Sequence, residues 1–222
     1  MKVALEKFEA YLDNPINYRS RFLLALLVLP LFLSFFAPLW NISMQAPQYP
    51  KGLEVDVWSY QVVGGNDGKD IPEINTLNHY IGMAPIEGEL LADLDWIPFA
   101  IGFLALLSLR TAVIGNIRTL VDLAVIYGYI SGFLAFRFWL HLYTLGHDLD
   151  PAAPVNVEPF TPAIFGSKQI ANFYITSLPR AGSIGVFVAV TGVFAITAWH
   201  LVKGYLGHKK NTAALAASTP TS

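Results

Sequence analysis

The sequence contains no cysteine and only three methionines, one of them the initiator Met1. Without cysteine the chain cannot form a disulfide, a thiolate-ligated zinc site or a CxxC redox centre. Histidine, methionine and carboxylate side chains are therefore the candidate metal ligands. Met44 and Met83 both fall in one polar stretch, and the apolar runs hold no methionine, although a flexible apolar side chain is common there. This uneven placement directs attention to the polar stretch.

Charged residues are also scarce. They make up 14% of the chain, whereas soluble proteins carry about 25%. Hydrophobic residues make up 54% and gather in four runs, most of them near the roughly 20 residues that a helix needs to cross a bilayer. The composition therefore predicts an all-α membrane protein in contact with a lipid bilayer. We expect transmembrane helices at residues 21–40, 96–115, 119–143 and 184–206.

The first apolar run is expected to stay in the protein. It is longer than the 7–15 apolar residues of a signal peptide, and no small-residue cleavage site follows it, because Pro38 and Trp40 come directly after Ala37. Residues 1–20 mix charged and apolar positions at near-helical spacing. This pattern predicts a short amphipathic segment on the cytoplasmic interface.

Lysine and arginine counts predict the orientation. With a cytoplasmic N-terminus, the inner segments hold nine of these residues and the outer segments four, while Arg137 lies within the third helix. Because the positive residues collect on the cytoplasmic side, we expect a multi-pass protein with both termini in the cytoplasm. The small, polar tail at residues 207–222 is expected to be disordered.

Two segments are expected outside the membrane, at residues 41–95 and 144–183. In the first, "GLEVDVWSYQVV" alternates as a strand or hairpin arm does, and "GGNDGKD" is typical of the turn that ends it. The second is rich in proline, which predicts an irregular but restrained path. We expect these two loops to pack together as one small extracytoplasmic cap.

The sequence offers little for catalysis. It has no glycine-rich phosphate loop, no nucleophile elbow and no paired carboxylates on an expected rigid element, so we do not expect an enzyme. Nucleic-acid binding is disfavoured as well, because the expected outer surface is acidic and the formal net charge is −2.

The stretch "INTLNHYIGM" contains a possible copper site. If Thr76–Ile81 forms a helical turn closed by Gly82, His79 and Met83 lie on one face. A thioether suits Cu(I), and imidazole suits copper in both redox states. Folding of the loop could add Met44, and His147 in "LGHDLD" could be a fourth ligand. The alternative is that Met83 anchors the loop and that His79 is an ordinary surface hydrogen-bonding residue.

Arg137 and His141 form a second polar group. They are four residues apart, so they share a helix face, and a charge at this depth needs a partner or water. Asp93 and Asp95 are the natural partners, and we assign Asp95 to a polar pocket that supports the cap. This group is either a structural ion pair or a pocket for an anion, a quinone headgroup or a metal-bearing partner.

No haem is expected. Two histidines that face each other across a bundle can hold one, but His141 lies near the end of an outward helix and His200 near the end of an inward helix. At a rise of about 1.5 Å per residue, the two side chains should lie near opposite faces of the membrane.

The pieces "MQAPQYP", "INTLNHYIGM" and "PFTPAIFGSKQIANFYITSLPRAG" resemble a family of small bacterial polytopic membrane proteins associated with genes for nitrous-oxide reductase and its copper maturation. The resemblance covers both outer segments. It implies a location in the bacterial cytoplasmic membrane and an accessory role in copper-site assembly, or in electron supply to a periplasmic copper enzyme. The alternative is a non-catalytic structural subunit of a respiratory or photosynthetic membrane complex, possibly linked to quinone, in which the cap docks a protein partner.

Overall fold

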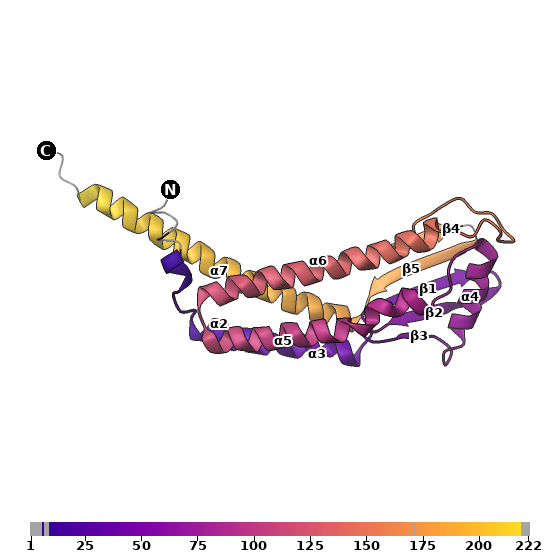
Figure 1. Ribbon diagram of the computed structural model, residues 1–222, viewed down its shortest axis with the longest axis horizontal. Coiled ribbons are helices and arrows are strands. Elements are labelled where there is room, and N and C mark those ends of the chain that lie inside the picture. The colour runs from indigo at the N-terminus through magenta and orange to yellow at the C-terminus, as the bar shows by residue number, and fades with distance from the viewer. Residues whose placement is uncertain (1–5, 7–8, 171, 219–222) are drawn as a thin grey trace. The chain divides into compact units, whose positions relative to one another are not determined.

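The computed structural model describes residues 6, 9–170 and 172–218 and is mostly helical, with one β-sheet (Figure 1). The helices are α2 (Tyr18–Leu26), α3 (Val28–Phe36), α4 (Asp70–Ile81), the 3-10 helix η1 (Gly88–Asp95), α5 (Ile97–Ile114), α6 (Ile117–His147) and α7 (Ala181–Ser218). The strands are β1 (Trp40–Ala46), β2 (Tyr49–Val57), β3 (Val62–Gly64), β4 (Gly166–Ile170) and β5 (Phe173–Pro179).

Four helical stretches are long and apolar enough to cross a membrane, as the composition predicts. They cover Tyr18–Phe36, Ala92–Ile114, Ile117–His147 and Ala181–Gly207. The predicted disordered tail differs from the structure, because α7 continues to Ser218. Residues 219–222, and residues 1–5 and 7–8 of the predicted amphipathic segment, lie outside the described residues, while residues 9–12 of that segment are helical.

Backbone contacts divide the chain into two units. The helical unit takes its described residues from ranges 1–29, 104–128 and 188–222. The sheet unit takes them from 30–103 and 129–187. All five strands fall in the sheet unit, so this unit holds both segments that the sequence places outside the membrane.

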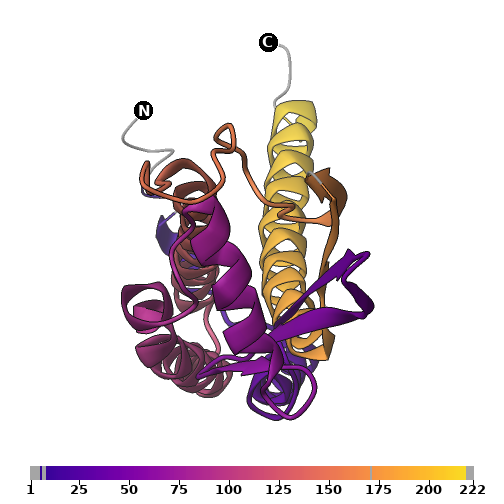
Figure 2. The same ribbon diagram turned by 90° about the vertical axis from the view of Figure 1, so that its right-hand side faces the viewer.

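The all-α prediction is wrong in the sheet unit. The five strands form a single antiparallel sheet in the order β3-β2-β1-β5-β4, seen from a second side in Figure 2. Its central pair joins the two outer segments, because Trp40 pairs with Pro179 and Gln45 with Tyr174. The Pro-rich segment predicted as irregular therefore contributes β4 and β5.

The first outer segment folds close to its predicted pattern. The sequence "GLEVDVWSYQVV" supplies most of β2 and all but the last residue of β3. The following turn needs left-handed backbone conformations, and Asn66, Asp67 and Gly68 supply them with φ of 50°, 58° and 84°. Asparagine, aspartate and glycine are the residues that tolerate this region best, so the turn prediction is confirmed.

Helix α4 covers part of one face of the sheet. Its Ile74 packs with Leu53 and Val55 of β2, and all three side chains are buried. At the first turn of the helix, the buried Asp70 accepts a hydrogen bond from the Glu54 backbone N–H (2.8 Å). These contacts fix α4 to the sheet, because Ile74 is buried against β2 and the Asp70 carboxylate satisfies a backbone N–H of β2.

The second outer segment is tied to the far end of α4 by backbone hydrogen bonds. The amide of Asp150 donates to the carbonyl of Gly82 (2.8 Å), and the amide of Val155 donates to the carbonyl of Tyr80 (2.9 Å). The predicted contact between the two outer segments is thus present in the sheet unit, both through the sheet and through this loop.

Some glycines of the long helices allow close contacts with neighbouring segments. In the sheet unit, the backbone of Gly185 lies against the Pro30 carbonyl, where a Cβ would collide. In the helical unit, a Cβ at Gly192 would lie 2.6 Å from Leu27. Gly132 differs, because a Cβ there would meet no atom of the described residues within 4 Å. Close approach therefore explains Gly185 and Gly192 and leaves Gly132 without a packing role.

Two glycines of α6 give a matched prediction. Gly146 accepts a hydrogen bond from the Phe160 amide (2.9 Å), and a Cβ at Gly146 would collide with the Phe160 carbonyl. We expect Gly146→Ala to lower the free energy of unfolding by about 1–3 kcal/mol, the usual cost of overpacking. Gly132→Ala should raise it by roughly 0.5–1 kcal/mol through helix propensity. Thermal unfolding of the detergent-solubilised protein measures both, and equal stability of the two variants would contradict this packing.

Candidate functional site

The copper motif of the sequence lies at the C-terminal end of α4. The helix ends at Ile81, and Gly82 follows with φ 79° in the left-handed region, as predicted. The amide of Met83 then donates to the carbonyl of Asn78 (2.8 Å). This pattern is a common way to end a helix on glycine, and it leaves His79 exposed on the last turn.

Two asparagines of the same motif hold the chain that leaves the helix. Asn75 accepts a hydrogen bond from the amide of Ile86 (2.8 Å), and the buried Asn78 donates to the carbonyl of Ala84 (3.2 Å). The amide side chains therefore fix the path of residues 83–86, which places Met83 beside the helix end.

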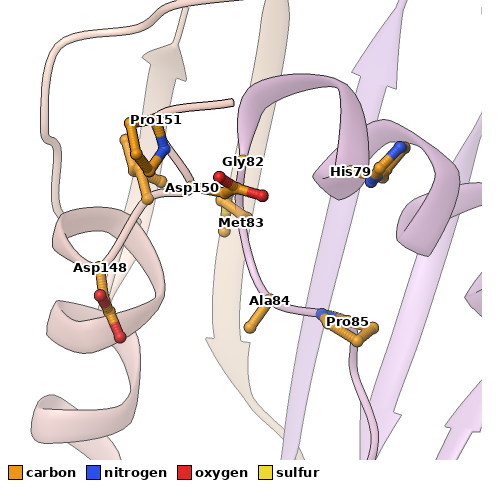
Figure 3. A pocket seen from close by; sticks show the side chains of 9 residues that line it. His79, Gly82, Met83, Ala84, Pro85, Asp148, Asp150 and Pro151 are labelled. Atoms are coloured by element: carbon orange, nitrogen blue, oxygen red, sulfur yellow. The ribbon is translucent and has the colours of Figure 1, made fainter. Parts of the chain in front are cut away.

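An open pocket of about 440 Å³ lies at this helix end in the sheet unit (Figure 3). One side comes from His79 and the residues just after α4, and the other side comes from the chain that follows α6. The lining residues are His79, Gly82, Met83, Ala84, Pro85, Asp148, Leu149, Asp150 and Pro151. The structure thus brings His79 and Met83 to one pocket and adds two carboxylates.

The four donors do not form a closed coordination site. Figure 3 shows the His79 ring and the Asp148 carboxylate on opposite sides of Met83. Within the described part of the chain, no group of three or more His, Asp or Glu side chains is close enough to hold a metal ion. The pocket is lined by the exposed His79 and the half-buried Met83, and one imidazole with one thioether is an incomplete ligand set for an ion bound by this chain alone.

The other two predicted ligands lie elsewhere in the sheet unit. Met44, in β1, packs against the apolar cluster of Leu53, Val55 and Ile74. His147, at the end of α6, stacks on Tyr143 with ring centroids 3.9 Å apart, and its Nδ1 lies 2.9 Å from the Tyr143 carbonyl oxygen. Neither residue lines the pocket. Met44 therefore has a packing role in this structure.

A second polar cluster joins η1 to α6. Asp93 Oδ2 accepts hydrogen bonds from Arg137 Nε (2.8 Å) and lies 2.7 Å from His141 Nε2. Its other oxygen accepts a hydrogen bond from Trp96 Nε1 (3.2 Å). The side chains of Asp93, His141 and Arg137 keep 17%, 25% and 32% of their exposure, so the charges are partly withdrawn from solvent and satisfied by one another.

The assignment of Asp95 to this cluster needs correction. Asp93 makes the contacts with Arg137 and His141, while Asp95 is exposed. Since the two carboxylates are two residues apart on a 3-10 helix, they point in different directions. The shared helix face of Arg137 and His141 is confirmed by the 3.4 Å between Arg137 Nη2 and His141 Nε2. These mutual bonds favour the structural reading of the cluster over a pocket for a quinone.

Sequence reasoning missed Asp148 and Asp150 as pocket residues. Both follow the last turn of α6 directly, within "LGHDLD". The signal that could have found them is this pair of carboxylates next to His147, which is itself a predicted ligand. Their position beside Met83 depends on the Asp150 to Gly82 backbone bond, which no local pattern reveals.

Comparison with known protein families, with curated proteins and with solved structures gives no match for this chain.

The ion cluster gives a paired prediction. Asp93→Asn removes the charge that Arg137 and His141 share, so we expect a loss of about 1.5–3 kcal/mol in the free energy of unfolding, as for hydrogen bonds to charged groups. Asp95→Asn, the matched control on the exposed side, should stay within about 0.5 kcal/mol of the parent protein. Thermal unfolding in detergent reports both values, and an equal effect of the two substitutions would show that the cluster adds no stability.

Proposed function

We propose that this chain is a non-enzymatic membrane accessory protein that binds copper transiently through His79 and Met83 and passes it to, or takes it from, a copper-handling protein partner. The observation that carries the proposal is the open pocket at the end of α4, which His79 and Met83 both line. In this proposal the sheet unit lies on the outer face of the bacterial cytoplasmic membrane, where the lysine and arginine counts place its two segments.

The incomplete ligand set supports transfer in preference to storage. A storage site encloses its ion with donors of its own chain, whereas His79 is exposed and faces away from Asp148. Cu(I) favours thioether and imidazole donors, and two such donors leave positions open for ligands of a second protein. A partner can then take the ion by replacing these donors one at a time.

The surroundings of the pocket fit a docking role. The chain that lines the pocket is held by hydrogen bonds of Asn75, Asn78 and Gly82. The backbone that carries His79 and Met83 is therefore fixed. The carboxylates of Asp148 and Asp150 add negative charge at the rim, which attracts a cation and a basic partner surface. The resemblance to proteins of copper-enzyme maturation points to the same role.

Titration of the purified full chain with Cu(I) against a chromophoric competitor tests the proposal. We expect one weakly held Cu(I) per chain, and a loss of affinity of at least tenfold in His79→Ala and in Met83→Leu, since each removes one of two donors. Met83→Leu keeps the shape and apolar character of the side chain, so it isolates the sulfur atom.

Two control variants sharpen this titration. Met44→Leu and His147→Ala remove the predicted ligands that lie outside the pocket, and both should bind Cu(I) like the parent protein. Binding that survives both His79→Ala and Met83→Leu, or that is lost in Met44→Leu, would contradict the assignment of the site.

A second candidate is a structural subunit of a respiratory or photosynthetic membrane complex. The observation that favours it is the sheet itself, whose strand β5 exposes Tyr174 (50%) and Leu178 (42%) on the same face as Ser43 of β1. Under this alternative, the double variant His79→Ala/Met83→Leu still co-purifies with the partner complex in mild detergent, whereas Tyr174→Glu does not. Under the copper proposal, the double variant loses copper-dependent association and Tyr174→Glu retains Cu(I) binding.

A further inference from the structure

An apolar groove with a single arginine lies in the helical unit, between α2 and the end of α5. Its volume is about 380 Å³. The α2 residues that line it are spaced at three and four positions, and so are those of α5. They are Tyr18, Arg21, Phe22 and Ala25 from α2, and Leu109, Ala112 and Val113 from α5. All lie at the ends of two stretches that can cross a membrane.

The arginine is held in place by neutral groups. Arg21 Nε donates to the Ala112 carbonyl (2.7 Å) and Nη2 donates to the Val113 carbonyl, which are free at the end of a helix. Its side chain also lies close to Gly115, where a Cβ would approach Nε to 2.8 Å. The position of the charge is therefore fixed by the fold.

The charge of Arg21 has no carboxylate partner among the described residues, whose ion pairs are Arg118–Asp13, Arg137–Asp93 and His141–Asp93. Its Nη1 also has no hydrogen-bond partner in the described part of the chain. A cation fixed beside an apolar groove at the end of a membrane span fits an anionic group at its head and hydrocarbon along its length.

We propose that this groove binds an anionic phospholipid, with its phosphate at Arg21 and an acyl chain along Phe22, Leu109 and Val113. Phe22 and Val113 are 60% and 75% exposed, so they offer apolar surface that a protein in water would cover. The segment before α2 is tied to the turn after α5, because Ile16 donates to the Gly115 carbonyl (2.8 Å). This hydrogen bond joins the two helices that line the groove at the end where the phosphate would bind. This site is independent of the copper proposal.

Native mass spectrometry with phosphatidylglycerol and phosphatidylcholine of identical chains tests the site. We expect the purified full chain to retain phosphatidylglycerol about fivefold more than phosphatidylcholine, the factor expected of one arginine at an anionic headgroup. Arg21→Gln, whose amide can still donate to a helix-end carbonyl, should remove this preference. Arg19→Gln is the matched control, since Arg19 lies two residues away and does not line the groove, and it should keep the preference.

A second variant covers the possibility that Arg21→Gln does not fold. Val113→Trp fills the groove and leaves the Arg21 hydrogen bonds to backbone carbonyls, so it should lose both lipids. Val125→Trp, at an exposed position of α6 (65%) outside the groove, should bind like the parent. Equal retention of both lipids by the parent chain, equal loss in Arg19→Gln, or unchanged binding in Val113→Trp would overturn the proposal.

Discussion

The antiparallel pairing of β1 with β5 is the contact on which the sheet unit depends. It joins segments that are 129 to 139 residues apart, from Gln45 opposite Tyr174 to Trp40 opposite Pro179. Closing so long a loop costs entropy that one strand pair repays only in part. The same unit adds further contacts, through the buried cluster under β2 and the hydrogen bond from Trp40 Nε1 to Ser177 Oγ (2.7 Å).

The position of the candidate site follows from this pairing. With β1 and β5 joined, the chain after α6 runs past the end of α4 and binds it through the Gly82 and Tyr80 carbonyls. His79 and Met83 then share a pocket with Asp148 and Asp150. The two asparagines of "INTLNHYIGM" hydrogen-bond to the chain that follows α4, whereas its histidine is exposed. In the proposed function, the exposed His79 and the half-buried Met83 fit an exchange of ions between proteins better than their retention.

Features with a local cause could be predicted from the sequence. The four apolar spans, the turn at Asn66–Gly68 and the glycine stop at Gly82 follow from hydropathy and backbone preference. Strands β4 and β5 are not predicted, because the neighbouring prolines favour an irregular path, although "FYITSLP" has strand-forming residues. Met44 is a predicted ligand but packs against Leu53, because β1 forms a strand where the sequence predicts a loop. The side chains of Asp93 and Asp95 leave the 3-10 helix in different directions, and the sequence does not show which one reaches Arg137.

The register of the sheet that joins residues 41–95 to residues 144–183 can be tested directly, because the chain has no cysteine. Ser43 lies opposite Thr176, within the range in which two cysteines can form a disulfide. Mild oxidation of the full chain with Ser43→Cys and Thr176→Cys should close an intramolecular disulfide in nearly every molecule, seen by mass after alkylation. Ser43→Cys with Tyr174→Cys, a diagonal pair at about 7–8 Å, should remain largely reduced. Efficient disulfide formation by the diagonal pair, or no disulfide formation by the opposed pair, would contradict this register of β1 and β5.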